Sequence, residues 1–495
     1  MQLPQPHPDR LAKRDELIRR LRMILDEEQI IDQPEDRVAY ECDALSAYRQ
    51  VPMAVVLPAS TEQVSGVITL CRDVGIPIVP WGAGTGLSGG ALPLEDGLVV
   101  SLAPMNRILD IDFPNRTVTV QAGVTNLAVS EAVHGHGFYY APDPSSQLAC
   151  TIGGNVAENS GGVHCLKYGT TTNNVLGIKA VFPDGEIVQL GGKSMDRSGY
   201  DLLALMTGSE GLLGIITEAT LRILPKPEIA RAMMAVFDSV EAAGQAVADI
   251  IAAGLIPAGM EIMDRFSIEA VEDFLGCGYP RGVESLLLVE LDGPRAEVEI
   301  QIGRVESLLI SSGATQIIKA ASEEERLRLW AGRKAAFPAM GRVTPDYYCM
   351  DGTIPRGQLA HVLNRIQALS KQHDLAVANV FHAGDGNLHP LVLYDSNAPG
   401  QLERAEAFGA DILRLCVEVG GVLSGEHGIG IEKRDLMSCM FSDDDLDIQE
   451  TIKAAFDPDD LMNPGKVYPT LRRCIEGGQM HVHHGELPFK DLERF

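Results

Sequence analysis

Three glycine-dense segments between residues 80 and 217 constrain the fold of this chain more than any other feature. They read PWGAGTGLSGG (80–90), PDPSSQLACTIGGNVAENSGGV (142–163) and GSEGLLGIIT (208–217). Glycine lacks a Cβ, so its backbone approaches a ligand closely and its N–H groups form an anion-binding concavity. Three such segments close together predict a long ligand cradled by backbone amides.

The first segment contains Gly84, Gly86 and Gly89, which have the G-x-G-x-x-G spacing of a Rossmann phosphate loop. A Rossmann loop requires a helix directly after the glycines, because the helix N-terminus binds the pyrophosphate. The strand-like run IPIVPW precedes the glycines, but a proline and an Asp-Gly pair in ALPLEDG (91–97) break any helix that follows. Taken alone, the motif fits a glycine turn without a ligand equally well.

Composition excludes several classes of protein. The chain has 495 residues and a formal charge of -27, so its average charge repels nucleic acid. Its nine cysteines are an odd number in a large chain, which argues against a disulfide framework, and they form no C-x-x-C pair or cluster that could hold an iron–sulfur centre. It has no apolar run of membrane-spanning length and no apolar signal core at the N-terminus. We expect a cytoplasmic protein, with peripheral contact at the inner face of the membrane left open.

The rest of the chain alternates strand-like and helix-like runs, which indicates an α+β protein. LPKPEIA (224–230) is a plausible domain boundary, because the glycine density falls there. Beyond it, we expect a mostly antiparallel sheet with helices on one face. Helices are expected at 10–28, 61–74, 125–136, 240–253, 295–312 and 357–373, and between 401 and 465.

The run VANVFHAGDGNLHPLVLY (377–394) predicts a β-hairpin centred on Asp385-Gly386. That hairpin pairs His382 directly with His389, so the two imidazoles share a face and are close enough to bind one divalent metal. The alternative is a pair of partly buried histidines hydrogen-bonded to the backbone.

Glu426 and His427 are adjacent in the glycine-flanked loop VLSGEHGIG (422–430). Neighbouring side chains in an extended chain point in opposite directions, so one can bind a metal while the other faces a different target. An isolated Glu-His pair is more often a solvated loop pair, but the flanking glycines and the histidine hairpin favour a functional role.

The glycine-dense segments, together with YGTTTNNVLGIKAVFPDG (168–185), HAGDGNLH, SGEHGIG and DPDDLMNPGK, resemble the FAD-binding family of the vanillyl-alcohol-oxidase type. These motifs cover about residues 50–470 and belong to the branch that oxidises 2-hydroxy acids. PDYYCMDGTIPR (345–356) is most similar to the FAD-linked subunits of glycolate oxidases. The resemblance implies an N-terminal helical segment (1–48), a two-lobed FAD-binding domain (49–227), an α+β substrate or cap domain (228–420) and a C-terminal segment (421–495) that returns to the flavin.

The resemblance also implies where FAD binds. The pyrophosphate is expected on the first glycine segment, the isoalloxazine and ribityl portions along 144–163, the adenine near Ile215 and Ile216, and Asn463 beside the flavin. No residue stands out as a covalent attachment point, so we expect non-covalent FAD. The expected FAD contacts are Pro80, Trp81, Gly82, Ala83, Gly84, Thr85, Gly86, Leu87, Pro144, Ser145, Ser146, Cys150, Thr151, Gly153, Gly154, Asn159, Gly161, Val163, Gly211, Ile215, Ile216 and Asn463.

Further roles follow from the same resemblance. His382, His389 and Glu426 are implied as ligands of a divalent metal, which the ligand types do not resolve between zinc, manganese and iron. His427 is implied as the catalytic base and Arg333, rather than the adjacent Lys334, as the group that binds the substrate carboxylate.

The expected substrate is a small 2-hydroxy acid. Relatives that act on larger hydroxy acids carry a lysine where this chain has Cys349, which argues against a dicarboxylate such as 2-hydroxyglutarate. The expected reaction is oxidation of glycolate to glyoxylate, or of D-lactate, within a complex that includes an iron–sulfur subunit. Two alternatives remain: a stand-alone D-lactate dehydrogenase, and a flavin-binding scaffold subunit without activity.

Overall fold

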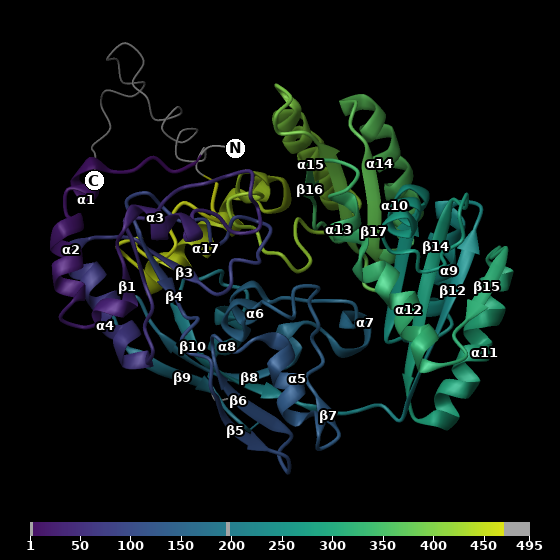
Figure 1. The fold of residues 1–495 in the computed structure, drawn as a ribbon, viewed down its shortest axis with the longest axis horizontal. Coiled ribbons are helices and arrows are strands. Elements are labelled where there is room, and N and C mark those ends of the chain that lie inside the picture. Colours follow the sequence, from purple (N-terminus) through teal and green to yellow (C-terminus); the bar gives the residue numbers. More distant parts are fainter. Residues whose placement is uncertain (1–2, 195–198, 470–495) are drawn as a thin grey trace, which may run out of the picture.

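The computed structural model describes residues 3–194 and 199–469, which form two lobes with the C-terminal segment between them (Figure 1). The first lobe contains a small mixed sheet and an antiparallel sheet, and the second is built on one large antiparallel sheet. In the described residues no helix is both long enough and apolar enough to cross a membrane.

The small sheet has the strand order β1-β2-β4-β3, and β2, β4 and β3 run parallel. α4 (Thr61–Val74) is capped by the Ser60 hydroxyl and ends at Gly75, whose φ of 71° suits glycine. α2 (Arg14–Leu21) packs on α4 and is shorter than the helix predicted at 10–28. The strands are β1 (Ile30–Ile31), β2 (Ala54–Val56), β3 (Ile78–Trp81) and β4 (Leu98–Ser101), and the other helices here are α1 (Pro8–Leu11) and α3 (Pro34–Arg37).

The second sheet of this lobe has the order β5-β6-β10-β8-β9 and is antiparallel throughout. α6 (Ile152–Glu158) contacts β10 and lies within the second glycine segment. The remaining elements are β5 (Ile108–Asp112), β6 (Thr117–Gln121), α5 (Asn126–His134), β7 (Phe138–Tyr139), α7 (Cys165–Tyr168), β8 (Val175–Val181), β9 (Ile187–Gly191), α8 (Leu202–Met206), β10 (Ile215–Arg222) and β11 (Leu224–Pro225).

The seven-stranded sheet of the second lobe has the order β15-β12-β14-β13-β17-β18-β16 and is antiparallel, as predicted. Its strands are β12 (Ile229–Phe237), β13 (Gly259–Asp264), β14 (Ser285–Gly293), β15 (Gln316–Lys319), β16 (Asp346–Cys349), β17 (Val377–His382) and β18 (Asn387–Tyr394).

Helices cover both faces of this sheet, so the prediction of one covered face was wrong. Alternate residues of β12 enter two separate apolar cores: Phe237 lies in one and Met234 in the other. The strands are therefore apolar on both sides and need two helical layers. One layer is α9 (Val240–Ala252), α11 (Arg295–Ser311), α14 (Leu359–His373) and α15 (Gln401–Glu418), and the other is α10 (Arg265–Leu275), α12 (Glu323–Lys334) and α13 (Ala336–Met340).

After α15 the chain leaves the large sheet and returns to the first lobe. It passes through the 422–430 loop, α16 (Met437–Met440) and α17 (Asp443–Phe456). The segment then adds to the small sheet, where Met462 bridges Ile78 and the Asn463 N–H donates to the Ile78 carbonyl at 2.7 Å. This return brings the 422–430 loop and Asn463 to the end of β3, where the first glycine segment begins.

Candidate active site

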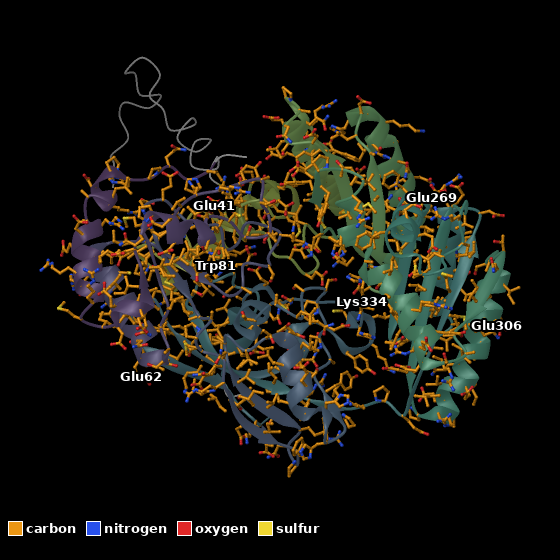
Figure 2. All side chains as sticks on the ribbon, viewed as in Figure 1. Glu41, Glu62, Trp81, Glu269, Glu306 and Lys334 are labelled. Atoms are coloured by element: carbon orange, nitrogen blue, oxygen red, sulfur yellow. The ribbon has the colours of Figure 1, made fainter. Side chains whose placement is uncertain are left out.

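A cavity of about 360 Å³ lies where the glycine segments of the first lobe meet the 422–430 loop and the large sheet. Trp81, which is labelled in Figure 2, is the last residue of β3 and forms part of the cavity wall. The wall also includes Phe337, His389, Glu426 and His427 from the second half of the chain. The cavity therefore connects a glycine-rich cradle with a histidine–carboxylate cluster.

The first glycine segment lines this cavity from Pro80 to Leu87. The next regular element is β4, parallel to β3, so no helix follows the glycines, as predicted. Gly84 has a φ of 65°, and a Cβ there would collide with the Trp81 ring. The segment is thus a close-packed backbone loop rather than a Rossmann turn.

Most of the other predicted cofactor contacts also line the cavity. The second segment contributes Pro144, Ser145, Ser146, Cys150, Thr151, Gly153 and Gly154, the third contributes Gly211, Ile215 and Ile216, and the C-terminal return contributes Asn463.

Three of the predicted contacts, Asn159, Gly161 and Val163, are not among the residues that line the cavity. Asn159 ends α6 with a φ of 54° and accepts hydrogen bonds from Thr170 and Thr172. A Cβ at Gly161 would lie 2.8 Å from the Glu426 Oε2, and Val163 packs against Gly259 of β13. After α6 the segment turns from the cradle toward the large sheet.

Several wall residues were missed by the sequence analysis. Three of them, Asn155, Glu158 and Ser160, lie within the second glycine segment, so the motif itself could have indicated that they line the site. Phe337, in contrast, follows no motif. The missed wall residues are Gly90, Ala91, Leu102, Asn155, Ala157, Glu158, Ser160, Glu210, Gly214 and Phe337.

The histidine hairpin forms with a different register from the predicted one. His382 is opposite Asn387 and His389 is opposite Val380, because the loop has four residues, Ala383–Gly386, rather than two. The slip is an even number of residues, so both histidines still share one face. Their ring centroids are 4.9 Å apart as diagonal neighbours.

Replacing Gly386 by Ala tests how strongly this loop sets the hairpin. Gly386 has a φ of 87°, and a Cβ there would collide with the Ile354 carbonyl oxygen. We expect Gly386→Ala to lower the free energy of unfolding by at least about 2 kcal/mol. Thermal denaturation of the purified variant measures this loss. Gly135→Ala is the control, because a Cβ at Gly135 meets no atom within 4 Å, and a similar loss in both variants would contradict the prediction.

Glu426 brings the two hairpin histidines together through one oxygen. Its Oε1 lies 3.1 Å from His389 Nε2 and 3.5 Å from His382 Nε2. His389 Nε2 is buried and makes no hydrogen bond of acceptable geometry with the residues that the structure describes. The Glu426 oxygen thus approaches both histidines, and His389 Nε2 is left without a hydrogen bond to any described residue.

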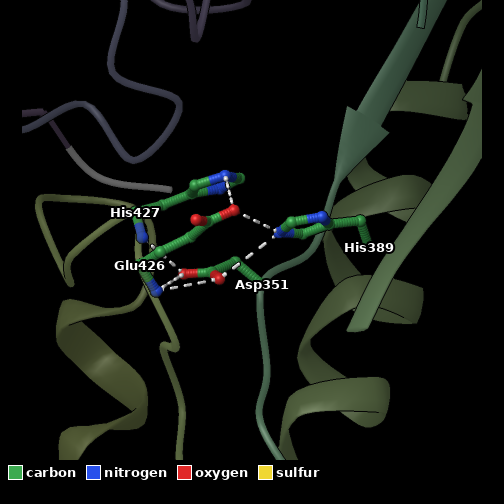
Figure 3. A group of neighbouring side chains, drawn as sticks. All are labelled: Asp351, His389, Glu426 and His427. Atoms are coloured by element: carbon green, nitrogen blue, oxygen red, sulfur yellow. Dashed lines mark hydrogen bonds and ion pairs between the residues drawn. The ribbon is translucent and has the colours of Figure 1, made fainter. Parts of the chain in front are cut away.

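The loop that carries Glu426 and His427 is held by Asp351, which sequence reasoning missed (Figure 3). The fully buried Asp351 carboxylate accepts the backbone N–H groups of Glu426 at 3.2 Å and His427 at 2.8 Å, and pairs with Lys433 at 3.3 Å. The backbone curls around this carboxylate instead of extending. Glu426 and His427 therefore face the same cavity, contrary to the prediction that they point apart.

His427 lies in this cluster as a mostly buried, neutral imidazole. Its ring is stacked on His389 with centroids 4.9 Å apart, and Nδ1 is buried without a hydrogen bond to any described residue. Burial lowers the pKa of His427 to about 4, and His389 acts in the same direction although the Asp351 charge opposes it. At neutral pH the imidazole is thus free to accept a proton.

Arg333 lies behind the cavity wall rather than on it. Its Nε donates to Glu261 Oε2 at 2.7 Å, and the other oxygen of Glu261 lies 2.7 Å from His382 Nδ1. Glu261 and His382 are directly opposite on β13 and β17. Arg333 is buried, whereas Lys334, labelled in Figure 2, is exposed. Arg333, rather than Lys334, is therefore linked to His382 through Glu261.

Cys349 is 5% exposed, lies in one of the two apolar cores of the sheet and is not among the residues that line the cavity. All cysteines in the described residues are free.

Comparison with known proteins gives consistent matches along the chain. Residues 52–191 match the family described as FAD binding domain, and residues 226–467 match FAD linked oxidases, C-terminal domain. The glycolate oxidase subunit GlcD of Escherichia coli (strain K12) is 58% identical over 467 residues, covering 94% of each chain. A D-lactate dehydrogenase of Anaerostipes hadrus is 35% identical and covers 86% of this chain and 91% of its own.

Among solved structures, 4-ethylphenol oxidase from Gulosibacter chungangensis superimposes with a TM-score of 0.78. It covers 95% of this chain and 100% of its own at 18% identity, a level of similarity that shows the fold alone.

Proposed function

Because the chain belongs to the FAD-linked oxidases of the vanillyl-alcohol-oxidase type, we propose that it oxidises glycolate to glyoxylate as the FAD-carrying subunit of a glycolate oxidase. Membership confirms the resemblance and the fold class predicted from the motifs. One observation carries the proposal: the glycine cradle and the histidine–carboxylate cluster open into the same cavity.

The cavity wall fits FAD. Gly82, Gly84 and Gly211 pack against other wall residues, which a Cβ would meet within 3 Å, so this part of the wall has no room for side chains and is formed by backbone. Three buried polar atoms on the wall lack a hydrogen-bond partner among the described residues: Glu158 Oε2, His389 Nε2 and His427 Nδ1. When bound, the flavin supplies the acceptor for the hydride from the substrate.

The separations from Glu426 to His382 and His389 fit one divalent metal, and Asp351 and His427 also have ligand atoms within 4.8 Å of His389 and Glu426. Ligand atoms around tetrahedral zinc are separated by about 3.3 Å, from bond lengths of about 2.0–2.1 Å. Glu426 Oε1 meets this spacing at 3.1 and 3.5 Å from the two imidazole nitrogens. His382 Nδ1 is held by Glu261, as expected for the outer nitrogen of a metal-bound histidine. A metal there would polarise the substrate hydroxyl.

The protein's own groups then have distinct tasks. His427 takes the hydroxyl proton, because its neutral imidazole faces the cavity. Arg333 is proposed to bind the substrate carboxylate from behind the cavity wall. Its guanidinium has five N–H donors, Glu261 accepts only part of this set, and Arg333 Nη2 is buried without a hydrogen bond of acceptable geometry to any described residue. We also propose that further subunits, including an iron–sulfur subunit, take up the electrons.

Anaerobic visible spectroscopy of the purified protein tests the proposed function. We expect glycolate to bleach the flavin bands, D-lactate to do so more slowly, and 2-hydroxyglutarate to leave them unchanged. A preference for D-lactate would favour the stand-alone dehydrogenase. A flavin spectrum that none of the three changes, in protein loaded with metal and partner subunits, would indicate a scaffold.

Glu261→Gln tests whether the outer carboxylate tunes the metal ligands. The amide loses the charge that fixes His382 Nδ1–H, so we expect a 10–100-fold weaker metal affinity. Chelator competition measures this affinity directly. Glu290→Gln is the matched control, because Glu290 is a buried carboxylate on the adjacent strand that pairs with Arg326 at 2.7 Å. Equal affinities in the two variants would refute the role of Glu261.

A further inference from the structure

The Glu158 side chain presents a carboxyl group to the cavity without a protein partner. Glu158 is the last residue of α6, and its Oε2 is buried and makes no hydrogen bond with any residue that the structure describes. A Cβ built at Gly90 would lie 3.0 Å from its Oε1, and one at Gly428 would collide with its Oε2. The carboxyl is thus enclosed between the first glycine segment and the 422–430 loop.

A second carboxyl, Glu210, lies beside it. A Cβ at Gly428 would also lie 3.0 Å from Glu210 Oε1, so both carboxyls approach the same point. The Glu210 oxygens accept the N–H groups of Ile429 and Gly430, each at 2.7 Å. Hydrogen bonds from N–H groups favour the ionised form, and two neighbouring buried carboxyls do not both ionise. Glu210 therefore carries the charge and Glu158 the proton.

Burial raises the pKa of both carboxyls, and at Glu210 the hydrogen bonds from Ile429 and Gly430 oppose that shift. Burial, followed by the Glu210 and Asp43 charges, raises the pKa of Glu158 well above its usual range. Two lysines oppose the shift, but their hydrogen bonds go elsewhere. Lys433 Nζ donates to the Gly428 carbonyl at 2.8 Å, and Lys466 Nζ donates to the Gly90 and Leu92 carbonyls and to Asn463.

A protonated carboxyl is a hydrogen-bond donor, and a buried donor without an acceptor is costly. We propose that Glu158, as a neutral carboxylic acid, donates a hydrogen bond to an acceptor atom on the isoalloxazine of the bound FAD and thereby raises its reduction potential. A hydrogen-bond donor that faces the isoalloxazine stabilises the reduced ring more than the oxidised ring, because the reduced ring carries more electron density. The inference rests on the FAD placement proposed above.

Glu158→Ala and Glu158→Gln, with the midpoint potential of the bound FAD measured against reference dyes, test the inference without any substrate. Loss of the donor in Glu158→Ala should weaken binding of the reduced cofactor about tenfold relative to the oxidised one, which lowers the potential by about 30 mV for a two-electron couple. Glu158→Gln keeps a weaker N–H donor, so its potential should fall between those of the Ala variant and the unsubstituted protein.

A higher potential in either variant would overturn the inference, because it would mean that Glu158 is ionised. An unchanged potential with weaker FAD binding would also overturn it, since the contact would then be only structural. If Glu158→Ala does not retain FAD, Glu158→Gln decides alone by the sign of its shift. A wrong placement of FAD gives a different result. In that case, substitution of the cradle glycines leaves FAD binding unchanged.

Discussion

Replacing His427 by Gln should reduce the rate at which glycolate bleaches the flavin by about 10²–10⁴-fold, the usual contribution of a general base. Glutamine retains a similar shape and hydrogen-bonding capacity but cannot accept the hydroxyl proton. The backbone N–H of residue 427 still donates to Asp351, so the loop should keep its conformation. FAD should therefore remain bound, and stopped-flow spectroscopy under anaerobic conditions measures the rate.

His373→Gln is a matched control for this variant. The His373 side chain is 14% exposed, against 15% for His427, and it pairs with Asp411 on α15 outside the cavity. We expect its rate to equal that of the unsubstituted protein. If His427→Gln retains turnover within a few-fold of this control, His427 is not the base.

The cofactor cradle could be predicted from the sequence because its information is local. Each glycine segment is contiguous, and the absence of a helix after Gly89 follows from a proline and an Asp-Gly pair in the next few residues. The predicted contacts that do not line the cavity lie at the end of the second segment. There the chain turns at Asn159, and nothing in the motif marks that turn.

The hairpin shows how a local prediction can have the wrong register and still identify the right pair. A four-residue loop shifts the partner of His382 from His389 to Asn387. Because side chains alternate with a period of two, this shift leaves both imidazoles on one face. The prediction of a shared face therefore held although the predicted pairing was wrong.

The supporting carboxylates could not be predicted in this way. Glu261 meets His382 only because β13 and β17 are neighbours in the large sheet, and the two residues are far apart in the sequence. Asp351 likewise reaches the Glu426 loop through tertiary packing. Local patterns contain no information about which distant strands become neighbours. The sequence therefore does not distinguish Glu261 and Asp351 from other acidic residues.

Replacing Glu426 by Gln should remove the proposed metal and with it most of the activity. The carboxylate oxygen that approaches both hairpin histidines would be exchanged for a neutral amide, which is a weaker ligand for a divalent cation. A bound metal stabilises the transition state by several kcal/mol, so its loss should lower turnover at least about 10²-fold. Elemental analysis and glycolate turnover, measured on the same preparation, give metal content and activity together.

The control for this variant is Glu218→Gln, because Glu218 is 18% exposed and pairs with Lys179 in the first lobe. It should keep both metal and activity. Adding metal in excess should restore part of the activity of Glu426→Gln, since the two histidine ligands remain. Full activity without bound metal would exclude a metal role for the cluster, because the acid would then serve only to orient His389 and His427.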